Sequence, residues 1–115
     1  MTAYAIAHIG PGNGPLHEDV LQYIERIQGT LTPYGGRFLV HFEEHELLEG
    51  EWHGAPVLIS FPDMAEARDW YASAAYQEIV PLRTRHLPGD IILVDGVPEG
   101  YDPAGTAAHV RAAQA

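Results

Sequence analysis

Residues 55–96 read APVLISFPDMAEARDWYASAAYQEIVPLRTRHLPGDIILVDG and predict a strand, a helical region and a second strand. The segments at 55–61 and 90–96 are short, apolar and bounded by turn residues, as strands are. Asp63, with Glu66 three residues later, is typical of a helix start that satisfies its own backbone donors. This part of the chain is therefore predicted to be β-α-β.

The helical region of this stretch is expected to be interrupted. We expect a break near Ser73. Proline lacks the N–H of an ordinary helical residue, so we also expect a kink at Pro81 unless Pro81 lies in the first turn of a new helix. The first piece is predicted to bury a stripe, and the second piece is predicted to carry a further apolar set. The stripe is Ala67, Trp70, Tyr71 and Ala74, and the further set is Tyr76, Ile79, Val80 and Leu82.

The first part of the chain repeats the same order. Residues 3–9 alternate with a period of two and predict a strand with Tyr4, Ile6 and His8 on one face. The loop GPGNGP (10–15) follows, with Pro15 expected at the first position of a helix that runs to Leu31. RFLVHF (37–42) predicts another strand, expected to place Arg37, Leu39 and His41 on a common face.

The order β-α-β-β-α-β is that of an α+β, ferredoxin-like fold. Right-handed crossovers place both helices on one face of a four-stranded antiparallel sheet. The opposite face is apolar and uncovered, so we expect a homodimer in which the two sheets pack together as a dimeric α/β barrel. We expect a domain over residues 1–96 and a tail or arm over 97–115, with a short helix near residues 104–113 or contact with a partner.

The composition excludes several kinds of chemistry. The 115 residues include no Cys and no Lys, and the net charge is −10. Thiol catalysis, Cys-ligated metals and Schiff-base lysines are therefore excluded. So acidic a chain is a poor partner for nucleic acid or an anionic membrane. We expect a cytoplasmic protein, because no export signal is recognisable at the start of the sequence. We also expect a protein without a cofactor.

Several motifs together resemble one known family. The motifs are YGGRFL (34–39), LEGEW (48–52), SFPDM (60–64), Trp70-Tyr71, Tyr76-Gln77, Leu82-Arg83 and GDIILVDG (89–96). Their combination resembles the domain of unknown function 1330 family, a branch of the dimeric α/β-barrel superfamily. The resemblance implies a homodimer of ferredoxin-like subunits. It implies little chemistry, although relatives in the wider superfamily include cofactor-free monooxygenases, isomerases and cyclases.

The candidate site is a small-molecule pocket between sheet and helices. Such pockets combine apolar walls with a few polar groups. An arginine can hold a carboxylate, and a histidine can act as a general base near neutral pH. The alternative for each residue is a structural role in the core or in a surface ion pair. The catalytic candidates are His8, Arg37, His41 and Arg83, and the ligand-binding candidates are Tyr4, Trp70, Tyr71 and Tyr76.

Two other motifs give weaker indications of a binding site. HFEEH (41–45) suggests a metal site using His41, Glu44 and His45, but along a strand of about 3.3 Å rise per residue the two histidines would lie about 13 Å apart. A single zinc binds histidine nitrogens at about 2 Å, so it cannot join them. The loop GPGNGP lacks the register of a phosphate-binding loop, and its prolines remove donors.

Three functions follow from these observations. The first is a homodimer with a small-molecule pocket, acting as a cofactor-independent enzyme of monooxygenase, isomerase or cyclase type on an aromatic or carboxylated metabolite. The second is a non-catalytic binding or accessory module. The third, less favoured, is a metal-binding protein using His41, Glu44 and His45 in the His/Glu segment at 41–53.

Overall fold

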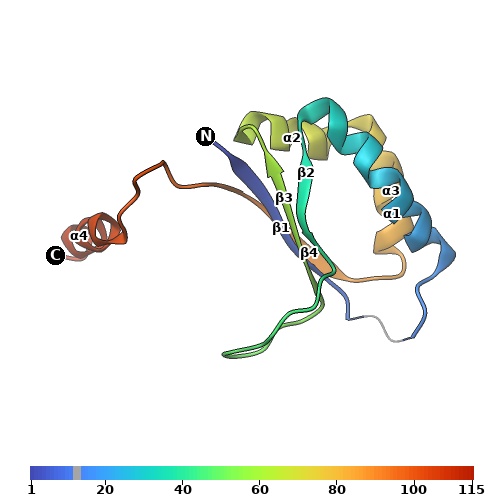
Figure 1. The fold of residues 1–115 in the computed structure, drawn as a ribbon, viewed down its shortest axis with the longest axis horizontal. Helices are drawn as coiled ribbons and strands as arrows, with labels where there is room; N and C mark the ends of the chain where they lie inside the picture. Colours follow the sequence, from blue (N-terminus) through green and yellow to red (C-terminus); the bar gives the residue numbers. More distant parts are fainter. Residues whose placement is uncertain (12–13) are drawn as a thin grey trace.

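The computed structural model describes residues 1–11 and 14–115, which form a four-stranded sheet covered by helices on one face (Figure 1). Residues 12 and 13 of the expected loop at 10–15 lie outside the described part. The elements in chain order are β1 (Ala3–Ile9), α1 (Glu18–Leu31), the short 3₁₀ helix η1 (Thr32–Tyr34), β2 (Arg37–His41), β3 (Ala55–Phe61), α2 (Met64–Ala72), α3 (Ala74–Thr84), β4 (Gly89–Asp95) and α4 (Pro103–Ala113).

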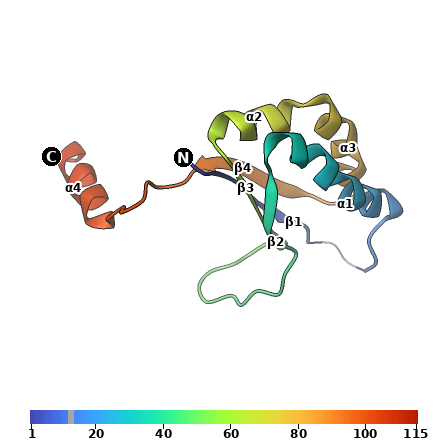
Figure 2. The ribbon, with the colours of Figure 1, turned by 45° about the horizontal axis from the view of Figure 1, so that its top comes forward.

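The fold is the predicted ferredoxin-like arrangement. The strands lie in the order β2-β3-β1-β4, and each neighbouring pair is antiparallel. Figure 2 shows α1, α2 and α3 together on one side of the sheet, and among the described residues no helix covers the other side. Alternation along β1 explains this layering, since Ala3, Ala5, Ala7 and Ile9 are buried beneath the helices.

The helical layer begins and ends at residues that satisfy the backbone. The side chain of Asp63 accepts the N–H of Glu66 at 2.8 Å, which confirms the predicted start of α2. Ser73 ends α2 and caps α3, so the predicted break is also confirmed. The helix α3 then continues through Pro81 to Thr84.

Two expectations about the helices were wrong. The helix α1 begins at Glu18 and not at Pro15, because the side chain of His17 accepts the N–H of Asp19 and supplies the cap. In the predicted stripe, Tyr71 and Ala74 are exposed, whereas Trp70 is fully buried. The change of direction at the cap between α2 and α3 removes Ala74 from the face that α2 presents to the core.

A β-bulge at Leu39 changes the expected face of His41. Arg37 pairs with Ser60 and Phe38 with Ile59, but the next pair is Val40 with Leu58, so Leu39 is an extra residue. Each extra residue moves the following side chains to the other face of a strand. Arg37 therefore lies on the face without helices while His41 faces the helices. The expectation that these two residues share a face was wrong.

The face without helices presents an apolar row across all four strands. In register, Val40, Leu58, Ile6 and Ile92 lie side by side from β2 to β4. Ile92 is 58% exposed and Ile6 is 37% exposed. We call this set the open-face row.

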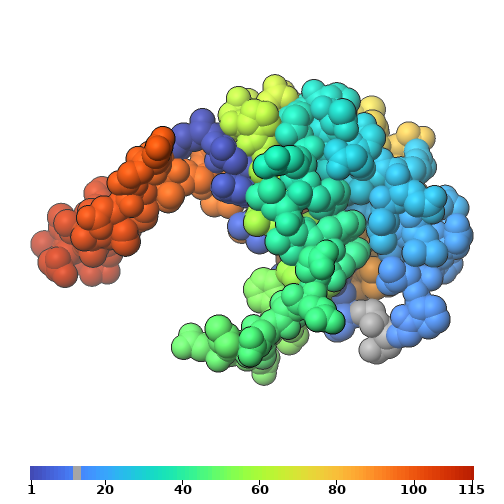
Figure 3. Space-filling view, viewed as in Figure 1, coloured from blue at the N-terminus to red at the C-terminus, as the bar shows by residue number. Residues whose placement is uncertain are grey.

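Two segments project from the layered body (Figure 3). One is the loop 42–54 between β2 and β3, in which Leu48 is 83% exposed. The other is the tail, which contains the expected helix as α4 and in which every residue from 97 to 115 is exposed. Among the described residues, no helix has the length and apolar character needed to cross a bilayer.

Candidate functional site

A small cavity lies between the helices and the sheet. Its volume is about 30 Å³, which is room for about two water molecules. Its walls are mainly apolar side chains from β1, β3, β4 and the helices. We call this space the inner cavity. The polar side chains that also line it are Tyr23, His41, Tyr76 and Arg83.

Tyr23 of α1 and Tyr76 of α3 meet inside this cavity. Their hydroxyl oxygens are 2.8 Å apart and hydrogen-bonded, and the side chains are 7% and 0% exposed. Burial strongly raises the pKa of Tyr76, and the neighbouring Tyr23 raises it further. Arg83 acts in the opposite direction, but burial outweighs it. Tyr76 is therefore a neutral hydrogen-bonding group and not a phenolate.

Arg83 is a charged side chain in the core. It lies on α3 at a spacing of four and seven residues from Ile79 and Tyr76, which places all three on the buried stripe of that helix. Arg83 is 7% exposed, and its guanidinium carbon lies 5.5 Å from the centre of the Tyr23 ring. A cation over an aromatic face gains electrostatic stabilisation.

His41 enters the cavity because of the bulge at Leu39. Its ring stacks on Phe38 at 4.3 Å between centroids and lies 4.4 Å from Phe42. Burial lowers the pKa of His41 below its ordinary value, and Glu43 opposes this effect only in part. Near neutral pH the imidazole is therefore neutral and can accept a proton.

Trp70 forms the back of the inner cavity. Its indole N–H donates to the hydroxyl of Thr30 at 3.0 Å, and that hydroxyl donates to the carbonyl of Ile27 at 2.7 Å. The Trp70 ring also packs 4.1 Å from the Tyr76 ring. The wall is thus fixed by hydrogen bonds as well as by packing.

A larger outer cavity adjoins the inner one. Its volume is about 480 Å³, and it is open to solvent. Ile9 and Phe42 line both cavities, so these two side chains separate the two spaces. Phe42 has a φ of 59°, which is unusual for a bulky residue and is found at functional sites. The remaining lining residues are Pro11, Leu16, His45, Gly54, Ala55 and Leu87.

The structure brings together only some of the predicted site residues. His41, Arg83, Trp70 and Tyr76 line the inner cavity. Tyr71 lies beside it, near Ile91 and Leu93 of β4, in a separate shallow cavity.

The expectation that Tyr4, His8 and Arg37 point into the same pocket was wrong. In the strand register, all three lie on the face without helices. On that face His8 pairs with Asp90 at 3.1 Å.

The sequence prediction missed Tyr23 and Phe42. Tyr23 could have been found, since it lies three residues after Val20 and four before Ile27 on the buried face of α1. Phe42 follows the bulge, and no sequence pattern indicated its backbone conformation.

The segment 41–45 does not form a metal site. His41 is in the inner cavity, whereas Glu44 and His45 belong to the exposed loop. Within the described residues, no three potential ligands of this segment converge.

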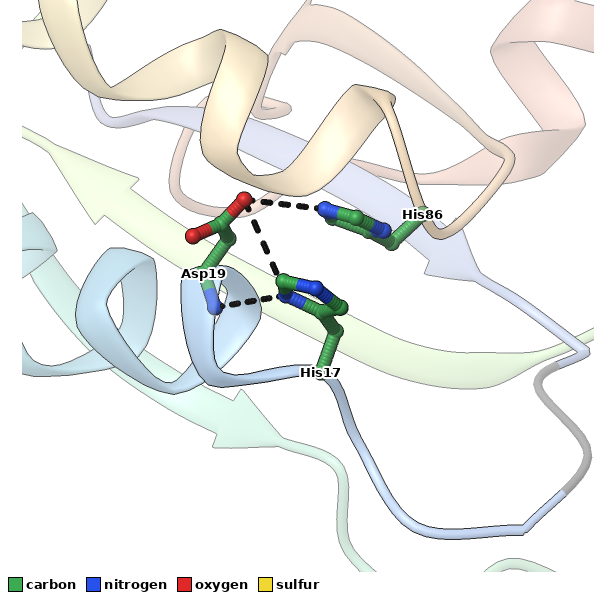
Figure 4. A group of neighbouring side chains, drawn as sticks. All are labelled: His17, Asp19 and His86. Carbon is green, nitrogen blue, oxygen red and sulfur yellow. Dashed lines mark hydrogen bonds and ion pairs between the residues drawn. The ribbon is translucent and has the colours of Figure 1, made fainter.

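A different cluster joins His17, Asp19 and His86, with their potential ligating atoms within 4.8 Å of one another (Figure 4). Nε2 of His86 lies 3.0 Å from Asp19, and this hydrogen bond lowers the pKa of Asp19. The two imidazoles are stacked at 3.7 Å with 11° between their planes, and Nδ1 of His17 already accepts the N–H of Asp19. Nearly parallel rings cannot direct their in-plane lone pairs at one ion. The cluster is a helix cap rather than a preformed metal centre.

The fold and the cleft place the chain in a class of proteins, the ferredoxin-like α+β proteins. This class includes dimeric proteins. Within this class, the chain belongs to the family described as domain of unknown function (DUF1330), whose model matches residues 2–97. No curated protein matches the chain.

Similar solved structures agree with the fold. A protein of unknown function from Rhodopseudomonas palustris has 13% identity and a TM-score of 0.65, over 84% of this chain and 83% of that one. A dimeric ferredoxin-like protein of unknown function from Jannaschia sp. CCS1 has 10% identity and a TM-score of 0.64, over 84% of this chain and 100% of that one. SnoaB, a cofactor-independent oxygenase from Streptomyces nogalater, has 13% identity and a TM-score of 0.50, over 88% and 96% of the chains.

Proposed function

We propose that this protein is a homodimer that binds a small molecule in the cleft between its helices and its sheet. The observation that carries the proposal is the grouping of His41, Tyr76 and Arg83 at the inner end of an apolar cleft. Binding sites for small molecules have this composition, with polar groups at one place in an apolar wall. The outer cavity of about 480 Å³ supplies the space that the inner cavity lacks.

The open-face row supports the homodimer. Exposed side chains such as Ile92 and Ile6 form a continuous apolar surface that a second sheet would cover. The fold is also that of a protein described as dimeric, which supports the proposal of a dimer. Light scattering of the purified protein measures the assembly directly, and a monomer at micromolar concentration would contradict this part of the proposal.

A variant that fills the outer cavity tests the binding site. Ala55 lines this cavity, so Ala55→Phe places a ring in the space proposed for the ligand. A metabolite library screened by ligand-observed NMR should yield binders that A55F no longer holds. Ala75→Phe, on the exposed surface of α3, is the matched control and should retain them. Binders that A55F retains would place the site elsewhere.

A catalytic function is the second candidate, and His41 favours it. A neutral imidazole inside a partly apolar cavity can take a proton from a bound ligand, and Arg83 and Tyr76 can stabilise the resulting negative charge. This chemistry requires no cofactor. A ligand found by the screen would be incubated with the protein in deuterated water and followed by NMR. Deuterium incorporation that His41→Gln abolishes identifies an enzyme, and a bound ligand without incorporation identifies a binding module.

A further inference from the structure

We infer that the ligand of this cleft is a carboxylate, and that Arg83 binds its charged group at the inner end. The inference rests on the proposed function and specifies its ligand class. Nε of Arg83 is buried and has no hydrogen-bond partner among residues 1–11 and 14–115. No aspartate or glutamate of these described residues lies within ion-pair distance of its guanidinium.

A buried guanidinium whose Nε has no hydrogen-bond partner is costly for the protein. Buried charges are normally paired, because burial removes the water that would solvate them. The Tyr23 ring at 5.5 Å compensates the charge in part, but a ring face offers no acceptor in line with Nε. A carboxylate would supply both an acceptor and a negative charge, and arginine binds this group with two parallel hydrogen bonds.

The tyrosine pair adds a second donor beside Arg83. Tyr23 and Tyr76 share one hydrogen bond at 2.8 Å, so one hydroxyl proton lies between the two oxygens and the other is free to donate. The guanidinium of Arg83 and one tyrosine hydroxyl therefore offer hydrogen-bond donors to a ligand in the inner cavity. This arrangement favours an anion over a cation or a neutral amine.

The sizes of the two cavities indicate how such a ligand would lie. The inner cavity, at about 30 Å³, suits a carboxylate group but not a whole metabolite. The outer cavity has room for an apolar body, and Leu16, Ala55 and Leu87 are among its walls. The ligand would pass between Ile9 and Phe42, which line both spaces. An aromatic or aliphatic monocarboxylate fits this shape.

Pairs of probes with one shape and different charge test the inference. Phenylacetate and hexanoate are titrated against their primary amides, and binding is followed by the NMR signal of the Trp70 indole N–H, which belongs to the cavity wall. We expect each carboxylate to bind at least about tenfold more tightly than its amide, because hydrogen bonds to charged groups are the stronger kind.

The matched variants are Arg83→Gln and Arg85→Gln, which make the same change of net charge. Arg85 follows α3 and is exposed, so R85Q should keep the preference for carboxylates while R83Q loses it. Arg83→Lys keeps the charge without the planar donor pair and should show a reduced preference. If R83Q does not fold, the inference is tested by the wild-type affinities for carboxylates and amides and by the preference that R83K shows.

Two negative outcomes are distinguishable. If amides bind as tightly as carboxylates, or if R83Q keeps the preference, the inference about the ligand class is wrong and the binding site stands. If no probe changes the Trp70 signal and Ala55→Phe does not affect any binder of the metabolite screen, the proposed function is wrong as well.

Discussion

Replacing Thr30 by valine removes the hydroxyl that holds Trp70 in the wall of the inner cavity. Thr30 and Trp70 are 6% and 0% exposed, and the indole N–H donates to the threonine hydroxyl at 3.0 Å. Valine has nearly the shape of threonine and a similar helix propensity. The substitution therefore changes the hydrogen bond more than the packing.

The expected cost follows from the buried groups that lose their partners. The indole N–H stays buried without an acceptor, which costs about 1–3 kcal/mol. The added methyl group recovers at most about 0.8 kcal/mol. The carbonyl of Ile27 loses the hydroxyl donor at 2.7 Å but is a helical carbonyl with a backbone donor available. We expect the free energy of unfolding to fall by about 1–2 kcal/mol.

A double-mutant cycle with Trp70→Phe measures this effect. Urea unfolding is followed by circular dichroism for the wild type, T30V, W70F and the double variant. Without the indole there is no orphaned donor, so T30V should cost at least about 1 kcal/mol less in the W70F background. The reasoning is refuted if T30V destabilises both backgrounds equally, or leaves the wild type unchanged.

Three further predictions concern the dimer, the buried histidine and a close backbone contact. Ile92→Asp places a charge in the open-face row of both subunits, so light scattering should show a monomer, whereas Leu21→Asp on the exposed side of α1 should leave the dimer intact. Burial lowers the pKa of His41 in the folded state below the ordinary value of 6.5. Between these two pKa values the unfolded state binds more protons than the folded state. The free energy of unfolding therefore decreases as the pH falls from 6.5 through the folded-state pKa. The difference in unfolding free energy between the wild type and His41→Gln should follow this decline, and a difference that does not vary with pH would contradict it. Gly54→Ala would place its Cβ 2.5 Å from the carbonyl oxygen of Ile9 at a φ of 98°, so we expect a loss of at least about 2 kcal/mol in urea unfolding. Gly50→Ala, with a φ of 75° and no atom near the new Cβ, should cost about 1 kcal/mol, and equal losses would show that the contact with Ile9 is unimportant.

The order of strands and helices could be predicted from local signals. The alternation of residues 3–9, the cap at Asp63 and the break at Ser73 all act over a few neighbours, and the structure confirms each of them. The start of α1 was misplaced for a related reason. Leu16 continues the apolar spacing of the helix, but the cap at His17 determines where the helix begins.

The composition of the site was harder to predict because it depends on register and on tertiary contacts. In RFLVH the three central residues are all apolar, so no alternation indicates which one is extra, and Arg37 and His41 were assigned to the same face. The burial of Arg83 was partly visible, since it lies seven residues after Tyr76 on one stripe of α3. The missing hydrogen-bond partner of its Nε could be seen only once the neighbouring elements were placed.

The extra residue in β2 also has an evolutionary consequence. Deleting Leu39 would remove the bulge but leave Val40 opposite Leu58 and His41 opposite Val57, so the imidazole would still face the cleft. If Leu39 instead paired regularly with Leu58, the imidazole of His41 would turn toward the surface proposed for the second subunit. The loss of one residue at this point therefore leaves the interior and the interface as they are, whereas regular pairing of Leu39 would exchange them. The chemistry available to this cleft thus depends on whether Leu39 is accommodated as an extra residue, while the remaining strands keep their pairing.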